Sequence, residues 1–234
     1  MGLVHFGSKV RIEKRKVTIM NVKRFLTIAG GAALLTTTVA SAEFYGLSAE
    51  LVGNGLIEGT WTARIYADLS AGSRVDAIYG NGANPLMMSS TGGLYQNIYG
   101  GDTSAEINAA LYGAFPSLMY DSWVTIGLED SGDNALGTIG MNFGDDEITT
   151  DDGSWFVTPD DSQGQEVGGK VLIAQFTTYG NDSHLYGTIS LQGKDASGAN
   201  WNADSVDYDF AKPAPGAIAL LGLAGFAGRR RRRA

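Results

Sequence analysis

Short runs of alternating apolar and polar residues, separated by glycine, asparagine and aspartate, restrict the fold of this chain most strongly. In the run 57–69 (IEGTWTARIYADL), one face would carry Trp61, Ala63, Ile65 and Ala67, and the other Thr60, Thr62, Arg64 and Tyr66. A period of two is typical of a strand with one buried face. Strands joined by such turn-rich segments predict an all-β fold, an antiparallel β-sandwich of jelly-roll or Ig-like type.

Other runs repeat this pattern. The clearest pair is 170–179 (KVLIAQFTTY) and 184–193 (HLYGTISLQG), with a turn around Gly180, Asn181 and Asp182 between them. Three weaker runs predict further strands: 73–80 (SRVDAIYG), 122–129 (SWVTIGLE) and 205–210 (SVDYDF). The last of these would close the domain before a linker that starts at Lys212.

One run has a helical pattern, 103–115 (TSAEINAALYGAF). Thr103 or Ser104 would cap it, Glu106 would lie in its first turn, and Pro116 would end it. We therefore expect one short helix that crosses the sandwich. The chain lacks the alternation of strands and helices that a parallel nucleotide-binding sheet requires, and it has no internal repeat of the solenoid or propeller kind.

The charge of the chain is distributed unevenly. Between residues 43 and 212 there are five basic and 24 acidic residues, which give a formal charge of −19. Such a domain would repel phosphate backbones, so nucleic acid is disfavoured as a partner. The acidity favours solubility or, alternatively, the binding of divalent cations. The chain has no cysteine, which excludes disulfides, thiolate metal sites and a cysteine nucleophile.

The first 42 residues have the three parts of a secretory signal peptide. Basic residues ending at Lys23 and Arg24 precede the apolar stretch 25–40, and Ala40 and Ala42 supply the small residues that signal peptidase requires. We predict cleavage after Ala42. A start at Met20 would already give a compact signal. The alternative is a buried helix of a cytosolic protein.

The C-terminal segment contains an apolar run at 217–227, eleven residues long, followed by five arginines: Arg229, Arg230, Arg231, Arg232 and Arg233. With its flanking glycines the run would be a helix of roughly 20 Å, shorter than the about 30 Å of a bilayer core. The arginines would keep the C-terminus on the cytoplasmic side. During export the run would therefore stay in the membrane, at least transiently.

Together with the signal peptide, Pro213, Ala214 and Pro215, the apolar run and the arginine cluster resemble a PEP-CTERM sorting signal. The resemblance covers 212–234. It implies processing by an exosortase, a membrane-embedded cysteine transpeptidase. The family pattern has glutamate where this chain has Ala214. This difference concerns which subtype of sorting enzyme recognises the tail rather than the role of the tail. A plain membrane anchor that is never cleaved is the alternative.

Residues 43–211 would form the exported domain, and three of its stretches are similar to β-rich domains of sorted surface proteins: 92–101, 120–130 and 153–161. That similarity implies no activity. His184 is the one histidine after the signal peptide, so a base that would activate a nucleophile is scarce. The sequence has no Gly-x-Ser-x-Gly elbow, no phosphate-binding loop and no His-Glu-x-x-His helix. We therefore predict that the protein is not an enzyme.

Calcium is the cofactor that the acidic loops favour, because it binds carboxylate and carbonyl oxygens of turns. The candidate ligands form two clusters: Asp145 and Asp146 with Asp151 and Asp152, and Asp160 with Asp161. Neither cluster has the EF-hand spacing. A solvated acidic surface is the alternative.

The four tryptophans suggest a second ligand class. Trp61 and Trp123 lie in alternating runs and are expected in the core, whereas the position of Trp155 and Trp201 near acidic turns suggests exposure. The alternative is that they too belong to the core or its edge, as most tryptophans of such a sandwich do. Exposed tryptophans would form a platform for matrix polysaccharide. The sequence thus predicts an exported cell-surface or extracellular-matrix protein that acts as a structural or interaction module. The alternative is a carbohydrate-binding module or a calcium-stabilised adhesion domain.

Overall fold

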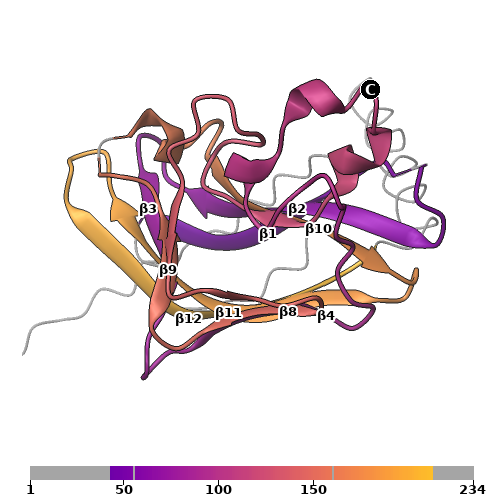
Figure 1. Cartoon of the computed structure of the whole chain (residues 1–234). Helices are drawn as coiled ribbons and strands as arrows, with labels where there is room; N and C mark the ends of the chain where they lie inside the picture. The colour runs from indigo at the N-terminus through magenta and orange to yellow at the C-terminus, as the bar shows by residue number, and fades with distance from the viewer. Residues whose placement is uncertain (1–42, 55, 160, 213–234) are drawn as a thin grey trace, which may run out of the picture.

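The computed structural model describes residues 43–54, 56–159 and 161–212. These residues form two antiparallel sheets that face each other across one hydrophobic core (Figure 1). The upper sheet in Figure 1 has four strands, in the order β1 (Phe44–Val52), β2 (Thr60–Leu69), β10 (Lys170–Tyr179) and β5 (Trp123–Val124). The predicted antiparallel all-β fold is confirmed.

The lower sheet has eight strands: β3 (Arg74–Gly80), β4 (Leu86–Ser90), β6 (Gly137–Ile139), β7 (Asn142–Phe143), β8 (Glu147–Thr150), β9 (Gly153–Phe156), β11 (His184–Lys194) and β12 (Asn200–Ala211). β11 pairs along its length with β12 on one side. On its other side β3 pairs with the second half of β11 and β4 with the first half. β9 and β8 continue this split arrangement next to β3 and β4.

The core forms where the alternating patterns predicted it. Trp61, Ala63, Ile65 and Ala67 of β2 are all buried between the sheets. The strands predicted at 170–179 and 184–193 are present as β10 and β11, and the other strands expected at 73–80 and 205–210 lie within β3 and β12. At about 25 cal/mol per Å² of apolar surface, this burial is the main stabilising contribution to such a fold.

The single helix predicted over 103–115 is not formed. Two short 3₁₀ turns, η1 (Ser104–Glu106) and η2 (Ala109–Leu111), replace it, and Pro116 begins a third, η3 (Pro116–Tyr120), instead of ending a helix. The side chain of Asn108 accepts a hydrogen bond from the Ala110 N–H, so it caps a new turn within the run. Short polar side chains compete with helical hydrogen bonds in this way.

The strand predicted over 122–129 is also shorter than expected. Only Trp123 and Val124 pair with β10, and the chain then turns at Gly127, whose φ is +80°. The N–H groups of Thr125 and Gly127 donate instead to the carbonyls of Ile173 and Leu172 in β10. Trp123, Val124 and Ile126 are buried, but Ile126 lies on a loop rather than on an extended strand, and Leu128 is only partly buried.

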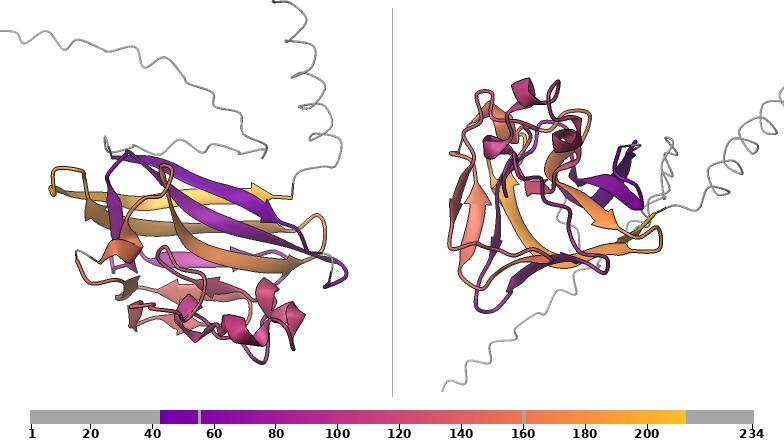
Figure 2. Two further views of the ribbon diagram at one scale, coloured as in Figure 1. Left: turned by 90° about the horizontal axis from the view of Figure 1, so that it is seen from above. Right: turned by 45° about the vertical axis from the view of Figure 1, so that its right-hand side comes forward.

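The three 3₁₀ turns pack against the β10–β5 side of the four-stranded sheet and leave β1 uncovered (Figures 1 and 2). A second apolar cluster lies between them, formed by Ile107, Leu118, Trp123 and Leu172. Because β10 has the main core on one face and this cluster on the other, its residues from 171 to 178 are all buried. On the opposite side of the sandwich, β1 and β12 contact each other and lie side by side (Figure 2).

Candidate functional site

The structure separates the aspartates that the sequence suggested as calcium ligands. Asp145 and Asp146 precede β8, while Asp151 and Asp152 follow it. At about 3.3 Å per residue, the five steps from Asp146 to Asp151 along this strand span roughly 17 Å. Asp161 lies at the start of η4 (Ser162–Gly164), where its carboxylate accepts a hydrogen bond from the Gln163 N–H.

Asp160 lies outside the described residues. Within 43–54, 56–159 and 161–212, no three side chains of His, Cys, Asp or Glu are placed to bind one metal ion. Calcium binding therefore stays a prediction.

The predicted exposure of Trp155 and Trp201 is wrong. Trp155 has no exposed surface, and its indole N–H donates to the Thr125 carbonyl at 3.0 Å. Trp201 is also buried and stacks on Phe44 of β1, with ring centroids 5.9 Å apart. Each lies on the inward face of its strand, next to an acidic turn that does not extend into the strand. The tryptophans predicted in the core, Trp61 and Trp123, are buried as expected.

His184 begins β11 and is partly exposed. Its Nδ1 lies 2.6 Å from a carboxylate oxygen of Asp209 on the neighbouring strand β12, and its backbone N–H donates to Thr91 Oγ1. These contacts lie where β11 begins and β12 ends, at one end of the lower sheet. The expectation that the protein is not an enzyme stays a prediction.

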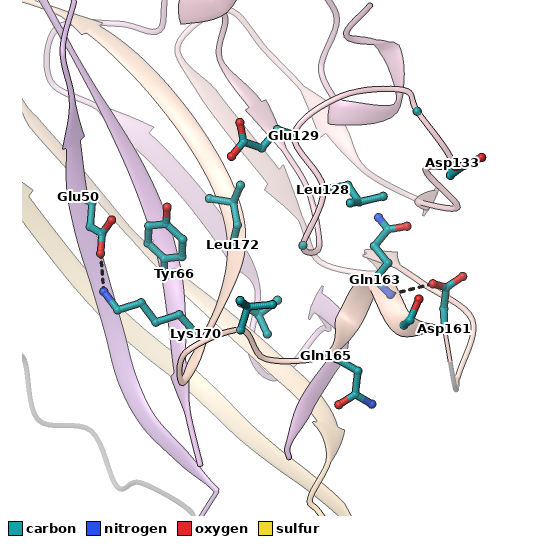
Figure 3. Close-up of a pocket in the computed structure, with 15 residues that line it drawn as sticks. Glu50, Tyr66, Leu128, Glu129, Asp133, Asp161, Gln163, Gln165, Lys170 and Leu172 are labelled. Carbon is teal, nitrogen blue, oxygen red and sulfur yellow. Dashed lines mark hydrogen bonds and ion pairs between the residues drawn. The ribbon is translucent and has the colours of Figure 1, made fainter. Parts of the chain in front are cut away.

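A cleft of about 680 Å³ lies on the outer face of the four-stranded sheet (Figure 3). Its floor is formed by Tyr66 of β2 and by Lys170 and Leu172 of β10. The loop 127–133 and the segment 161–167 form its walls. The sequence pattern had placed Tyr66 on the outer face of its strand, but it gave no sign that two distant loops would enclose this position.

The floor of the cleft combines an aromatic ring with an ion pair (Figure 3). Lys170 Nζ lies 2.7 Å from a carboxylate oxygen of Glu50 in β1 and 5.1 Å from the centroid of the Tyr66 ring. Burial, and then the charge of Glu50, raise the pKa of the Tyr66 phenol. The phenol thus stays protonated at neutral pH and can donate a hydrogen bond to a ligand.

The two walls of the cleft meet where the backbone of Gly127 lies close to the backbone of Gln163. A Cβ atom at this position would lie 1.9 Å from the carbonyl oxygen of Gln163, and the residue has a positive φ. Only glycine fits both conditions. The side chain of Gln163 fixes the same corner, since its Nε2 donates to Asn134 Oδ1 at 2.8 Å and its Oε1 accepts from the Ala135 N–H at 3.0 Å.

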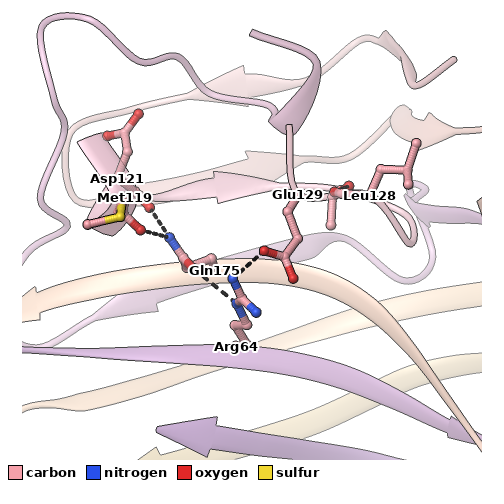
Figure 4. A network of polar contacts seen from close by, with 7 residues as sticks. Arg64, Met119, Asp121, Leu128, Glu129 and Gln175 are labelled. Atoms are coloured by element: carbon pink, nitrogen blue, oxygen red, sulfur yellow. Dashed lines mark hydrogen bonds and ion pairs between the residues drawn. The ribbon is translucent and has the colours of Figure 1, made fainter. Parts of the chain in front are cut away.

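A polar network links the cleft to the 3₁₀ segment (Figure 4). Arg64 Nη2 lies 2.5 Å from a carboxylate oxygen of Glu129, and Arg64 Nε donates to Gln175 Oε1 at 3.2 Å. The buried amide of Gln175 donates in turn to the carbonyls of Met119 and Asp121, both at 3.0 Å. Glu129 is thereby held at the rim of the cleft by residues of the sheet.

The lining of the cleft suits an uncharged or cationic ligand. Four carboxylates and one ammonium group line it: Glu50, Glu129, Asp133, Asp161 and Lys170. The excess of negative charge disfavours anionic ligands. The exposed side-chain amide of Gln165 adds a donor and an acceptor to the lining, whereas the amide of Gln163 is already engaged by Asn134 and Ala135. This combination of one ring and many hydrogen-bonding groups is suited to polyhydroxylated compounds.

No helix in the described part of the chain has the length and apolar character that a bilayer crossing requires. The predicted signal peptide with Ala40 and Ala42, the Pro213–Pro215 motif, the apolar run at 217–227 and the arginines at 229–233 lie outside the described residues. Comparison with protein-family models finds no match, and searches of the curated proteins and of the solved structures find none either.

Proposed function

We propose that this is an exported protein of the cell surface or extracellular matrix, in which the acidic sandwich is a non-enzymatic structural or interaction module. Signal peptidase would remove residues 1–42, and an exosortase-type enzyme would process the tail at 212–234. The finer description of the sandwich as jelly-roll or Ig-like, and the helices expected at both ends, belong to this proposal.

The positions of the first and last strands carry the proposal. β1 begins at Phe44, two residues after the predicted signal cleavage site, and β12 ends at Ala211, two residues before Pro213. Cleavage at both places would therefore leave every described strand and its pairing intact. The formal charge of −19 between residues 43 and 212 is suited to a domain that stays soluble outside the cell.

Mapping both termini of the protein isolated from its native host tests this proposal. We expect mass spectrometry to find Glu43 as the first residue and a C-terminus near Pro213. In a variant with Ala42→Phe, signal peptidase should fail to cleave because position 42 must hold a small residue, and the precursor should accumulate. A mature chain that keeps Arg229–Arg233 would instead identify a permanently tethered protein.

A second candidate function is glycan binding in the cleft. The tryptophans that suggested it are buried, but the cleft offers the Tyr66 ring and the side-chain amide of Gln165 in their place. Its negative lining favours neutral or amino polysaccharides over acidic ones. No comparable grouping of the described residues favours calcium-stabilised adhesion.

Tyr66→Ala is expected to weaken binding to a neutral polysaccharide by about tenfold, which corresponds to about 1.4 kcal/mol. Affinity gel electrophoresis with soluble glucans measures the change. Tyr45→Ala is the matched control, because Tyr45 is exposed on β1 and does not line the cleft. Equal retardation of the wild type and both variants would exclude the cleft as the binding site.

A further inference from the structure

Large apolar side chains are exposed at the end of the sandwich where β10 ends. This is the right-hand end in Figure 1. We name this set the apolar end surface: Leu56 (57 % exposed), Ile98 (88 %), Tyr99 (44 %) and Tyr179 (46 %). Contiguous exposed apolar groups on a soluble protein indicate an interaction site more often than isolated ones do.

Strand pairing, backbone hydrogen bonds and a ring contact place these four residues at the same end. Tyr179 is the last residue of β10 and pairs with Thr60, the first of β2. The N–H of Gly180 donates to the carbonyl of Gly59, in the loop that contains Leu56. The ring of Tyr179 meets that of Tyr95 edge to face at 6.3 Å, and the Tyr95 hydroxyl accepts from Asn97 Nδ2 at 2.9 Å. Ile98 and Tyr99 follow directly.

The loop that presents Ile98 is firmly held. The buried carboxylate of Asp121 accepts from the N–H of Asn97 at 2.6 Å and from the N–H of Gly101 at 3.1 Å. The Tyr99 N–H donates to Asn97 Oδ1, and the Tyr99 ring stacks on Phe115 with centroids 3.9 Å apart. The exposure of Ile98 is therefore fixed by the loop geometry, so little conformational entropy is lost when a partner covers it.

The surroundings of Ile98 also differ in charge from the rest of the domain. Residues 91–120 contain two acids, Asp102 and Glu106, and no lysine or arginine. Glu58 and Asp182 lie in the two neighbouring loops at this end. A partner of this surface must therefore be apolar and need not be anionic. A phosphate-rich partner has no cluster of cations to bind.

The chain also leaves the sandwich at this end. Ala211, the last residue of β12, pairs with His184, and Lys212 Nζ donates to Asn181 Oδ1 at 2.7 Å. Only residues 213–216 separate Lys212 from the apolar run at 217–227. Five steps of extended chain span at most about 17 Å, whereas β10 alone extends over roughly 30 Å. If the apolar run lies in a membrane, this end must face the lipid and the opposite end cannot reach it.

We propose that the apolar end surface docks on the lipid bilayer while the tail anchors the chain. Leu56, Ile98, Tyr99 and Tyr179 would enter the interface, where aromatic and aliphatic side chains are favoured. The sandwich then stands upright on the membrane, and Pro213 and Pro215 lie at its surface, within reach of a membrane-embedded sorting enzyme. This inference rests on the proposed sorting of the tail.

Site-specific fluorescence tests the docking, because a chain without cysteine accepts one label at a chosen position. The chain from Glu43 to Ala234, without the signal peptide, carries either Ile98→Cys or, as the matched control, Val167→Cys. Each variant is labelled with a polarity-sensitive dye and reconstituted into phosphatidylcholine vesicles. Val167 is 83 % exposed next to Lys170, at the far end of β10. We expect the emission of the label at position 98 to shift to the blue and rise several-fold, and that at position 167 to stay unchanged.

Flotation of the same samples distinguishes the possible failures. If the chain floats with the vesicles while both labels stay in water, the docking is refuted and the sorted tail is not. If both labels respond equally, the chain adsorbs without orientation and the docking is again refuted. If the chain does not float, the docking is refuted. The sorting proposal is then tested separately, by the mass spectrometry of the two termini.

Discussion

Asp121→Ala is expected to lower the free energy of unfolding by about 3–5 kcal/mol, because each buried N–H group that loses its acceptor costs about 1–3 kcal/mol. Asp121 has no exposed surface, and its carboxylate accepts from the N–H groups of Asn97 and Gly101. A Cβ atom at Gly100 would lie 1.6 Å from its Oδ2, so the loop is wrapped closely around the carboxylate. Urea unfolding followed by tryptophan fluorescence measures the loss.

The stability of the wild type should also depend on pH through Asp121. Burial, which outweighs the backbone N–H donors, raises the pKa of this carboxyl from its ordinary value of 3.8 to about 6. Between these two values the folded chain binds a proton that the unfolded chain does not. Protonation of Asp121 therefore stabilises the fold as pH falls through 6 towards 4, and this contribution is lost as pH rises.

Asp121→Asn isolates that contribution, since other carboxyls titrate in both proteins. A shift of this size corresponds to about 3 kcal/mol between pH 4 and pH 7. We expect the difference in unfolding free energy between wild type and Asp121→Asn to change by that order across this range. Asp151→Asn, at an exposed turn, should leave the pH dependence unchanged. Identical pH profiles for wild type and Asp121→Asn would contradict the assignment.

The sequence predicted those strands whose side chains alternate cleanly. β2 and β11 were recognisable because a buried and an exposed face impose a period of two, whereas β10, which is buried on both faces, was recognisable as an apolar run that ends at a turn. β1 was missed, because Gly46 lies at an irregularity in its pairing with β2 that interrupts the alternation. β8 and β9 were missed because Asp151 and Asp152, which dominate the composition there, occupy only the short break between two strands. The local composition therefore predicted the turn correctly but gave no indication of the strands on either side of it.

The candidate site was less accessible from sequence than the fold. Tyr66 was placed correctly on the outer face of β2, yet the cleft depends on contacts between segments far apart in the chain, such as Arg64 with Glu129 and Lys170 with Glu50. The same applies to Asp121, because the backbone N–H groups that donate to its carboxylate belong to a loop some twenty residues earlier in the chain. No periodic pattern encodes such pairs, because they follow from the path of the loops over the sheet.

Trp155→Ala is expected to be among the most damaging single changes in the sandwich, with a loss of about 3–5 kcal/mol in unfolding free energy. The indole is completely buried in the main core, and its N–H satisfies the carbonyl of Thr125 across the sandwich. Removing it leaves both a cavity and an unpaired buried acceptor. For a domain of this size, that loss corresponds to a fall in Tm of roughly 10 °C.

The same variant separates a core role from a ligand platform. An exposed tryptophan that stacks on sugar would tolerate alanine with an unchanged Tm and lose only binding. A buried one should respond in stability first, and Trp155→Phe should recover most of the packing while still lacking the hydrogen bond to Thr125. Calorimetry ranks Trp155→Ala, Trp155→Phe and the exposed control Tyr45→Ala by their Tm. An unchanged Tm for Trp155→Ala would place this indole outside the core and restore the tryptophan platform as the glycan site, whereas a large loss leaves the Tyr66 cleft as the surface on which sugar binding must be tested.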